Sequence, residues 1–295
     1  MRIYNVITQK GGTGKSETVK NLAYGLALKG LRVLVVDLDP QANTTSTILK
    51  LNKTVTPKTL NDIKKDYDSL VTNEATGREG IDIINKYMLK DCGKSDVCDV
   101  LLNPNNIKNA IKHTTYKNID ILPSSSRLIE VDMRLKASSM KVDTRLQMAL
   151  EHIESDYDVC VIDNSPFINA VTINGISACK NEGDTIIIPI KIENGSLEGV
   201  DTTLQQLIEI LNYSTFLAFD FKLLFTMRNR NKIEAEIEET LRHLFPGRCY
   251  EQTIRYQAKP VVTASLEKKI LIESSDSSVA NDYRKFVDEV YKNGK

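Results

Sequence analysis

The sequence has no apolar run near the ~20 residues that a membrane-spanning helix needs. Its longest apolar runs, such as 33–36 and 186–190, are short and predict buried strands. Residues 1–9 lack the order of charged, apolar and small residues that marks a signal peptide. These absences predict a cytoplasmic protein without a stable membrane association.

An excess of one charge and a set of close-spaced metal ligands are also missing. Lys plus Arg and Asp plus Glu both number 39, which excludes a globally basic nucleic-acid binder but not a local basic patch. The five cysteines are scattered, no C-x-x-C pair occurs, and only three histidines are available. A zinc site needs such ligands at close spacing, so free thiols are the better interpretation.

The chain instead alternates short apolar strands with helical patterns. A strand-like run over 3–8 leads through a Gly-rich turn and a helical pattern to an apolar strand over 32–37, which is a βαβ unit. Near-continuous apolar strands are typical of a parallel sheet covered on both faces. Further strands are expected at 119–122, 159–163, 185–190 and 222–226, and further helices at 127–153, 196–212, 231–244 and 279–291. The sequence predicts a doubly wound α/β fold with a mostly parallel sheet and helices on both faces.

The stretch 51–96 breaks this rhythm, because it is polar and rich in Lys, Asp, Asn and Thr. We expect an inserted helical or flexible segment within a single domain over residues 1–295. Two interpretations stay open for it, a solvated excursion or a contact with a partner. The solvated excursion is favoured, because a polar stretch buries little apolar surface.

The strongest signal is a Gly-rich loop between the first strand and the first helix. Glycines let the backbone wrap closely, so its N–H groups point at phosphate oxygens, and the following helix adds its positive end. Lys15 is expected to reach the β- and γ-phosphates of a nucleotide, and Ser16 to ligate Mg²⁺. A purely structural turn is a poor alternative, because the full Gly-Lys-Ser pattern is present in a strand-to-helix context. The expected nucleotide-binding residues here are Gly11, Gly12, Thr13, Gly14, Lys15, Ser16 and Glu17.

A second lysine, Lys10, precedes the glycine pair. Because Lys15 already serves the phosphates of its own chain, Lys10 is available to another site, such as a second nucleotide across a dimer. A surface lysine is the alternative that this residue alone leaves open.

Carboxylates follow two of the expected strands. Asp37 and Asp39 stand at the end of the strand over 32–37, and Asp163 ends the strand over 159–163. Ligands of open α/β sheets bind outside the carboxyl ends of the strands, so these side chains are expected beside the phosphates. One of Asp37 and Asp39 is a candidate for holding a Mg²⁺-bound water and the other for orienting the attacking water, and Asp163 is a candidate Mg²⁺ partner.

Segments 10–16 and 37–41 together resemble the signature of the deviant Walker A ATPases, the ParA/MinD group of P-loop NTPases. Within that group the chain is most similar to the short, Soj-like ParA partition ATPases. Three further stretches carry this similarity: NIDILPSSSR at 118–127, TIIIPIKIENGSLEG at 185–199 and LFTMRNR at 224–230. The resemblance covers about residues 1–50 and 97–292, and the chain departs from the group at Glu17, at Asn164 and Ser165, and in the arm over 254–271.

The resemblance implies an ATPase that binds ATP with Mg²⁺ and dimerises with ATP sandwiched between the subunits. In such a dimer Lys10 reaches the partner's nucleotide, Asp39 activates water and Asp163 is the Walker B carboxylate. Met227 and Arg228 are expected near the adenine. Members of the group bind non-specific DNA of the nucleoid as ATP dimers, and a ParB-like centromere-binding protein stimulates their slow hydrolysis.

A basic stretch toward the C-terminus is a candidate DNA surface. Residues 221–270 carry ten Lys and Arg against six Asp and Glu. A basic patch gives salt-sensitive, sequence-independent binding to phosphates, and a solvated charged face is the alternative. The candidate DNA-binding residues are Arg228, Arg230, Arg255, Lys259, Lys268 and Lys269.

Three other functions compete with partitioning or positioning of DNA. A MinD-like membrane-cycling ATPase needs a C-terminal amphipathic helix with a basic face, but acidic residues interrupt the tail over 282–295. An iron–sulfur reductase on the same core needs placed thiolates, but Cys92 and Cys98 lie in a polar region and Cys160 in an apolar strand. An adaptor with an inactive ATP site is disfavoured, because the phosphate-binding lysine and the carboxylates are present.

Overall fold

A computed structural model describes residues 1–51, 57–70, 95–138, 142–192, 205 and 220–294. Within these residues seven strands form one sheet in the order β3-β4-β2-β5-β1-β6-β7. Every neighbouring pair is parallel except β3 and β4, which are antiparallel. The predicted doubly wound, mostly parallel α/β fold is confirmed.

The strands have the following bounds: β1 Arg2–Val6, β2 Val33–Leu38, β3 Lys112–His113, β4 Ile119–Leu122, β5 Val159–Asn164, β6 Thr185–Lys191 and β7 Asp220–Thr226. The helices have the following bounds: α1 Lys15–Leu28, α2 Asn43–Ile48, α3 Pro57–Leu70, α5 Val97–Leu102, α6 Ile107–Ala110, α7 Leu128–Ala137, α8 Arg145–Glu151, α9 Ala170–Ser177, α11 Lys232–Leu244, α12 Ala258–Leu266, α13 Leu271–Ser274 and α14 Ser278–Asn293.

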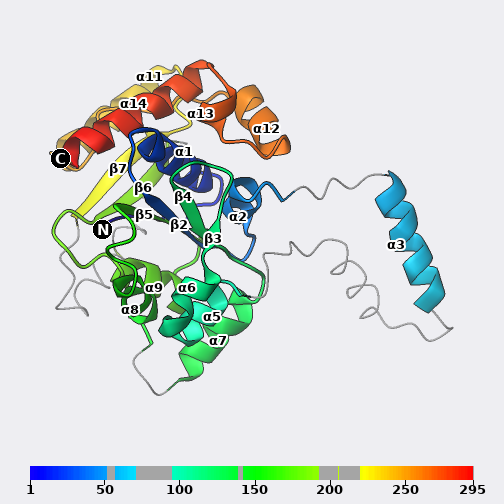
Figure 1. Cartoon of the computed structure of the whole chain (residues 1–295). Helices are drawn as coiled ribbons and strands as arrows, with labels where there is room; N and C mark the ends of the chain where they lie inside the picture. Colours follow the sequence, from blue (N-terminus) through cyan, green and yellow to red (C-terminus); the bar gives the residue numbers. More distant parts are fainter. Residues whose placement is uncertain (52–56, 71–94, 139–141, 193–204, 206–219, 295) are drawn as a thin grey trace.

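Helices cover both faces of the sheet, as Figure 1 shows. Alternate residues of a strand point to opposite faces, so Ile3 and Tyr4 of β1 belong to two different cores. The core on one face is completed by α1, α13 and α14, and the core on the other by α5, α7, α8 and α9. Burial on both faces explains why β2 and β5 are apolar almost throughout.

The predicted strands agree with the structure to within two residues at each end. The helices expected at 231–244 and 279–291 correspond to α11 and α14. The single helical pattern over 127–153 is wrong as one element, because it divides into α7 and α8. The helix expected at 196–212 lies outside the described residues, apart from residue 205.

Several short elements were not expected from the sequence. Strand β3 has only two residues, too few for a period-2 pattern to appear. Helix α2 reads NTTSTI, a composition with low helix propensity, so packing rather than propensity forms it. Within the polar stretch 51–96, Pro57–Leu70 forms helix α3. The assignment of that stretch as an insertion in a single domain stays a prediction.

Buried Asp184 ties the start of β1 to the turn that precedes β6. Its side chain is 1% exposed and accepts hydrogen bonds from the backbone N–H groups of Ile3 (2.8 Å), Lys180 (3.0 Å) and Asn181 (2.8 Å). Removing the carboxylate leaves these donors without their acceptor. We expect Asp184→Ala to lower the free energy of unfolding by about 2–4 kcal/mol. Urea denaturation measures the loss, and Asp184→Asn, which keeps one acceptor oxygen, is expected to lose less.

Candidate functional site

The Gly-rich loop leaves β1 and enters α1 at the carboxyl edge of the sheet. Gly12 and Gly14 have φ values of +73° and +84°, a left-handed conformation that favours glycine. The hydroxyl of Thr226, the last residue of β7, donates to the carbonyl of Thr13 at 2.7 Å and fixes the loop against the sheet. The loop therefore begins α1 in the geometry that a phosphate-binding turn requires.

Lys15 contacts residues at the ends of two strands, β2 and β5. Its side chain is 9% exposed, and its Nζ lies 3.2 Å from Asp163 Oδ1 and 3.8 Å from Asp39 Oδ2. The same ammonium donates to the backbone carbonyl of Asn164. The structure thus places Lys15, Asp39 and Asp163 in one cluster, as the sequence predicts.

Asp37 lies in the same cluster but faces a different set of donors. It pairs in register with Asp163 on the neighbouring strand, and it is fully buried. Its Oδ1 accepts from the backbone N–H of Asp39 at 3.0 Å, and its Oδ2 accepts from the N–H and hydroxyl of Thr45 at 2.8 and 2.7 Å. Burial, together with the nearby Asp163 carboxylate, raises the pKa of Asp37 to about 7. The protein donors favour a positioning role, and a role as direct Mg²⁺ ligand stays a prediction.

Ser16, Glu17 and Lys10 complete the loop. Ser16 is partly exposed in the first turn of α1, beside Lys15. Glu17 pairs with Lys20 at 2.7 Å and accepts from Asn21 Nδ2 at 2.9 Å, so its carboxylate is directed along α1. Lys10 is partly exposed on the other side of the glycine pair. These residues keep their predicted places around the loop, and their roles stay predictions.

Three hydroxyl residues of the cluster were not predicted. Thr44 Oγ1 donates to Asp163 Oδ2 at 2.6 Å. Ser124 Oγ donates to the backbone carbonyl of Asp39 at 2.6 Å, and its N–H donates to Thr45 Oγ1 at 3.0 Å. The sequence offered one signal for these residues, which was their position. Thr44 comes after β2 and Ser124 after β4, at the carboxyl ends of the strands, where ligands of such sheets bind.

The residues expected near the adenine lie beside the loop. Met227 follows β7, and its Cε is 3.7 Å from the place where a Cβ on Gly14 would lie. Arg228 is directed elsewhere, because its guanidinium pairs with Glu234 at 3.2 Å and Glu238 at 3.0 Å. Met227 therefore lies against the Gly-rich loop, and its contact with the adenine stays a prediction, whereas the Arg228 side chain is held by α11.

The six candidate DNA-binding cations fall into two groups. Arg228, Arg255 and Lys269 each pair with carboxylates, Arg255 with Asp282 at 2.6 Å and Lys269 with Glu267 at 2.9 Å. Among the described residues no carboxylate pairs with the other three, which are Arg230, Lys259 and Lys268. Within the described part of the chain, this second group has charges free of an internal counterion, whereas the first group does not.

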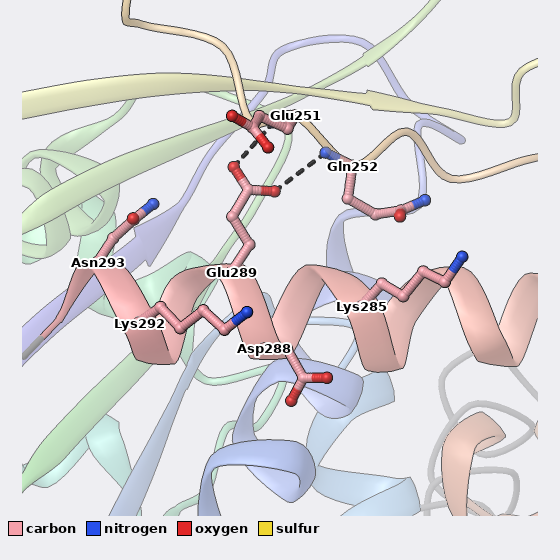
Figure 2. Close-up of a pocket in the computed structure, with 7 residues that line it drawn as sticks. All are labelled: Glu251, Gln252, Lys285, Asp288, Glu289, Lys292 and Asn293. Atoms are coloured by element: carbon pink, nitrogen blue, oxygen red, sulfur yellow. Dashed lines mark hydrogen bonds between the residues drawn. The ribbon is translucent and has the colours of Figure 1, made fainter.

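A neighbouring groove carries charges of both signs (Figure 2). Lys285 and Lys292 line it on α14 together with Asp288. Glu289 accepts from the backbone N–H groups of Glu251 and Gln252 at 2.8 and 3.0 Å, which fixes that loop against α14. The groove therefore does not add a purely positive region to the surface of the candidate DNA-binding residues.

Helix α14 uses its apolar side inside the protein. Tyr283, Phe286, Val287 and Val290 are buried in the core that α1 shares. In the described part of the chain, no helix is both long and apolar enough to cross a membrane. The burial of the apolar side removes the feature that a membrane-cycling ATPase needs in this helix.

The cysteines that the structure describes do not gather at the loop. Cys160 and Cys179 are fully buried within the sheet core, and Cys98 is buried on α5. Burial raises the pKa of the Cys160 and Cys179 thiols, which keeps them protonated. Cys92 lies outside the described residues. Cys98, Cys160 and Cys179 thus have the properties of core residues rather than cluster ligands.

A strand-to-helix glycine loop, a buried lysine and carboxylates at the ends of adjacent parallel strands define a P-loop ATPase site. A model of the AAA domain family matches residues 1–216. The chain belongs to this family, as a ParA/MinD-type ATPase of the Soj-like kind.

Individual relatives agree with this assignment. The chain is 28% identical over 294 residues to the sporulation initiation inhibitor protein Soj of Bacillus subtilis, with 99% of each chain covered. It is also 28% identical to the chromosome partitioning protein ParA of Caulobacter vibrioides, covering 98% of this chain and 94% of that one. Among solved structures, cobyrinic acid a,c-diamide synthase of Mycobacterium smegmatis with bound ATP analogue and magnesium has a TM-score of 0.72 at 21% identity, covering 100% of this chain and 96% of that one. This last similarity shows the fold alone.

Proposed function

We propose that this protein is a dimerising ATPase that partitions or positions DNA, and that it binds non-specific DNA in the ATP state and releases it on hydrolysis. The observation that carries the proposal is the Lys15 ammonium, held at the Gly-rich loop between Asp39 and Asp163. The near full-length likeness to Soj and ParA supports partitioning as the use of that site.

ATP fits the site through its phosphates. The loop ends in the N-terminus of α1, whose free N–H groups and helix dipole attract anions. The Lys15 ammonium is a point charge on a flexible stem, so it can exchange Asp163 Oδ1, which lies 3.2 Å away, for a phosphate oxygen. Thr13 and the glycines offer backbone N–H donors around the same point.

The charges of the site favour a divalent cation. Asp37, Asp39 and Asp163 are all buried, and Lys15 is the cation that pairs with two of them. Mg²⁺ is held by one or two carboxylates plus substrate phosphates, and the donors here are carboxylate and hydroxyl oxygens. Ser16 and Asp163 would hold the ion, directly or through water, and the bound ion would neutralise charge on the phosphates.

Asp39 is the residue we assign to the attacking water. Its Oδ1 accepts from the N–H of Gln41 at 2.9 Å, and Ser124 holds its backbone carbonyl, so the carboxylate is fixed beside Lys15. A fixed carboxylate next to the phosphate lysine can orient a water and accept its proton. Lys10 is assigned to the nucleotide of the partner subunit, because Lys15 already serves its own.

The first test is ATP-dependent DNA binding. Non-specific duplex is titrated with the purified protein in ATP, ADP or no nucleotide across a salt series, and size is measured in parallel by light scattering. We expect ATP to give dimers that bind DNA, with affinity that falls as salt rises. A second partner, a ParB-like centromere-binding protein, is expected to raise the slow rate of hydrolysis.

Lys10→Ala separates the proposed dimer from simple ATP binding. We expect this variant to bind ATP with wild-type affinity but to form neither ATP dimers nor a DNA complex, because it loses the proposed contact to the partner's nucleotide. Lys29→Ala, at the other end of α1, is the control and is expected to behave as wild type. Dimers without DNA binding at low salt would contradict the DNA function, and vesicles would be tested next.

A further inference from the structure

Two adjacent threonines at the start of α2 donate to two different buried carboxylates. Thr44 Oγ1 lies 2.6 Å from Asp163 Oδ2, and Thr45 Oγ1 lies 2.7 Å from Asp37 Oδ2. Both threonines and both carboxylates are 0% exposed. Because β2 and β5 bring the two carboxylates into register, one turn of helix reaches both.

The chain path before α2 keeps the threonines in place. Ala42 has a φ of 50°, a left-handed conformation that costs a residue other than glycine about 1–2 kcal/mol. The turn is held by the Ala42 N–H, which donates to the Asp39 carbonyl at 2.9 Å, and by the Gln41 N–H, which donates to Asp39 Oδ1. The same residue that we assign to the attacking water thus also fixes where α2 begins.

The two oxygens of Asp163 have different partners. Oδ1 accepts from Lys15 Nζ at 3.2 Å, and Oδ2 accepts from the Thr44 hydroxyl at 2.6 Å. A carboxylate that loses one of two such bonds can rotate and present the other oxygen. The Thr44 bond therefore decides which oxygen of Asp163 lies toward the Lys15 side of the cluster.

We infer that Thr44 is a positioning residue of the ATPase site, whose hydroxyl fixes the orientation of Asp163 toward Lys15 and the Mg²⁺-bound phosphates. This inference rests on the proposed function. Partners that orient metal-ligating carboxylates typically change metal affinity or activity about 10–100-fold when they are removed. Thr45 supplies the equivalent bond to Asp37 and accepts from the Ser124 N–H at 3.0 Å, so α2 is also tied to the Asp39 loop.

The chain offers a matched control on the same helix. Thr47 is 3% exposed, and its hydroxyl donates to the helix carbonyl of Asn43 at 3.1 Å rather than to a carboxylate. Thr47→Val therefore removes the same group from the same helix without touching Asp163. Thr44→Ser keeps the hydroxyl that Thr44→Val removes.

The test compares the full-length wild type with Thr44→Val, Thr44→Ser and Thr47→Val. Binding of a fluorescent ATP analogue is titrated with Mg²⁺ and repeated in EDTA, ATP hydrolysis is measured at saturating ATP, and Tm verifies folding. We expect Thr44→Val to raise the half-saturating Mg²⁺ concentration and to lower kcat, each by about 10–100-fold, with analogue affinity in EDTA unchanged. Thr44→Ser is expected to restore both values, and Thr47→Val to keep them.

The inference is overturned if folded Thr44→Val matches Thr47→Val in the Mg²⁺ titration, or if Thr44→Ser fails to rescue it. The proposed function fails separately. A wild type that binds the analogue but hydrolyses no ATP would contradict the ATPase, and the Mg²⁺ titration would still decide the role of Thr44. A wild type that binds no analogue would overturn both.

Discussion

Lys15→Ala is expected to weaken ATP binding by about 30- to 4,000-fold, since truncating one partner of a buried, hydrogen-bonded charge pair costs about 2–5 kcal/mol. The ammonium is 9% exposed and reaches Asp163, Asp39 and the Asn164 carbonyl from one position. The substitution removes the cation that is expected to bind the phosphates. The carboxylates of Asp39 and Asp163 then face an anionic ligand. Hydrolysis and ATP-dependent DNA binding should disappear with it. Isothermal titration with ATP and Mg²⁺ measures the affinity.

Two controls test whether the loss of ATP binding in Lys15→Ala has another cause, such as misfolding. Lys29→Ala removes a lysine from the end of α1, where it pairs with Asp288 at 2.5 Å far from the loop, and is expected to keep ATP affinity. Thermal unfolding verifies that Lys15→Ala is folded. Wild-type ATP affinity in folded Lys15→Ala would show that the loop does not hold the phosphates through this residue.

Asp39→Ala is expected to lower kcat by about 100- to 10,000-fold while ATP binding is retained, because a positioned base contributes to the chemical step. The variant should accumulate in the ATP state, so its dimers and DNA complexes should outlast those of the wild type. Single-turnover hydrolysis and the decay of the DNA complex after ATP removal measure the two effects.

Asp39→Asn tests the charge of the Asp39 side chain separately from its hydrogen bond within the turn. The amide keeps an oxygen that can accept from the Gln41 N–H, so the geometry of the turn and the start of α2 should survive. We expect Asp39→Asn to be nearly as slow as Asp39→Ala. Wild-type hydrolysis in Asp39→Asn would show that Asp39 only holds the turn. Another residue would then orient the attacking water.

The site could be predicted in part because its chemistry is contiguous in the chain. The Gly-Lys-Ser loop lies within eight residues, and a left-handed φ at Gly12 and Gly14 is a property that glycine itself permits. Asp39 directly follows an apolar strand and Asp163 stands near the end of another, and the edge rule for parallel sheets places them together. Position in a strand was sufficient to find them.

The rest of the site depends on contacts between distant segments. Ser124 meets Asp39 from 85 positions away, and Thr44 meets Asp163 from 119 positions away. Neither contact has a local pattern, because a single buried hydroxyl leaves no periodicity in a sequence. The pairing of Arg228 with α11 is also tertiary, and it changes a cation proposed for DNA or adenine into half of an internal ion pair.

The sequence by itself determined the class of fold, the place of the glycine loop and the three carboxylates beside it, because apolar strands and glycine turns are local properties that survive in any packing. The tertiary structure decided which donors each carboxylate has, that α14 buries its apolar side, and which basic side chains keep their charge free. These features depend on burial and on which distant segments pack together. The type of a residue does not determine the position of its partner.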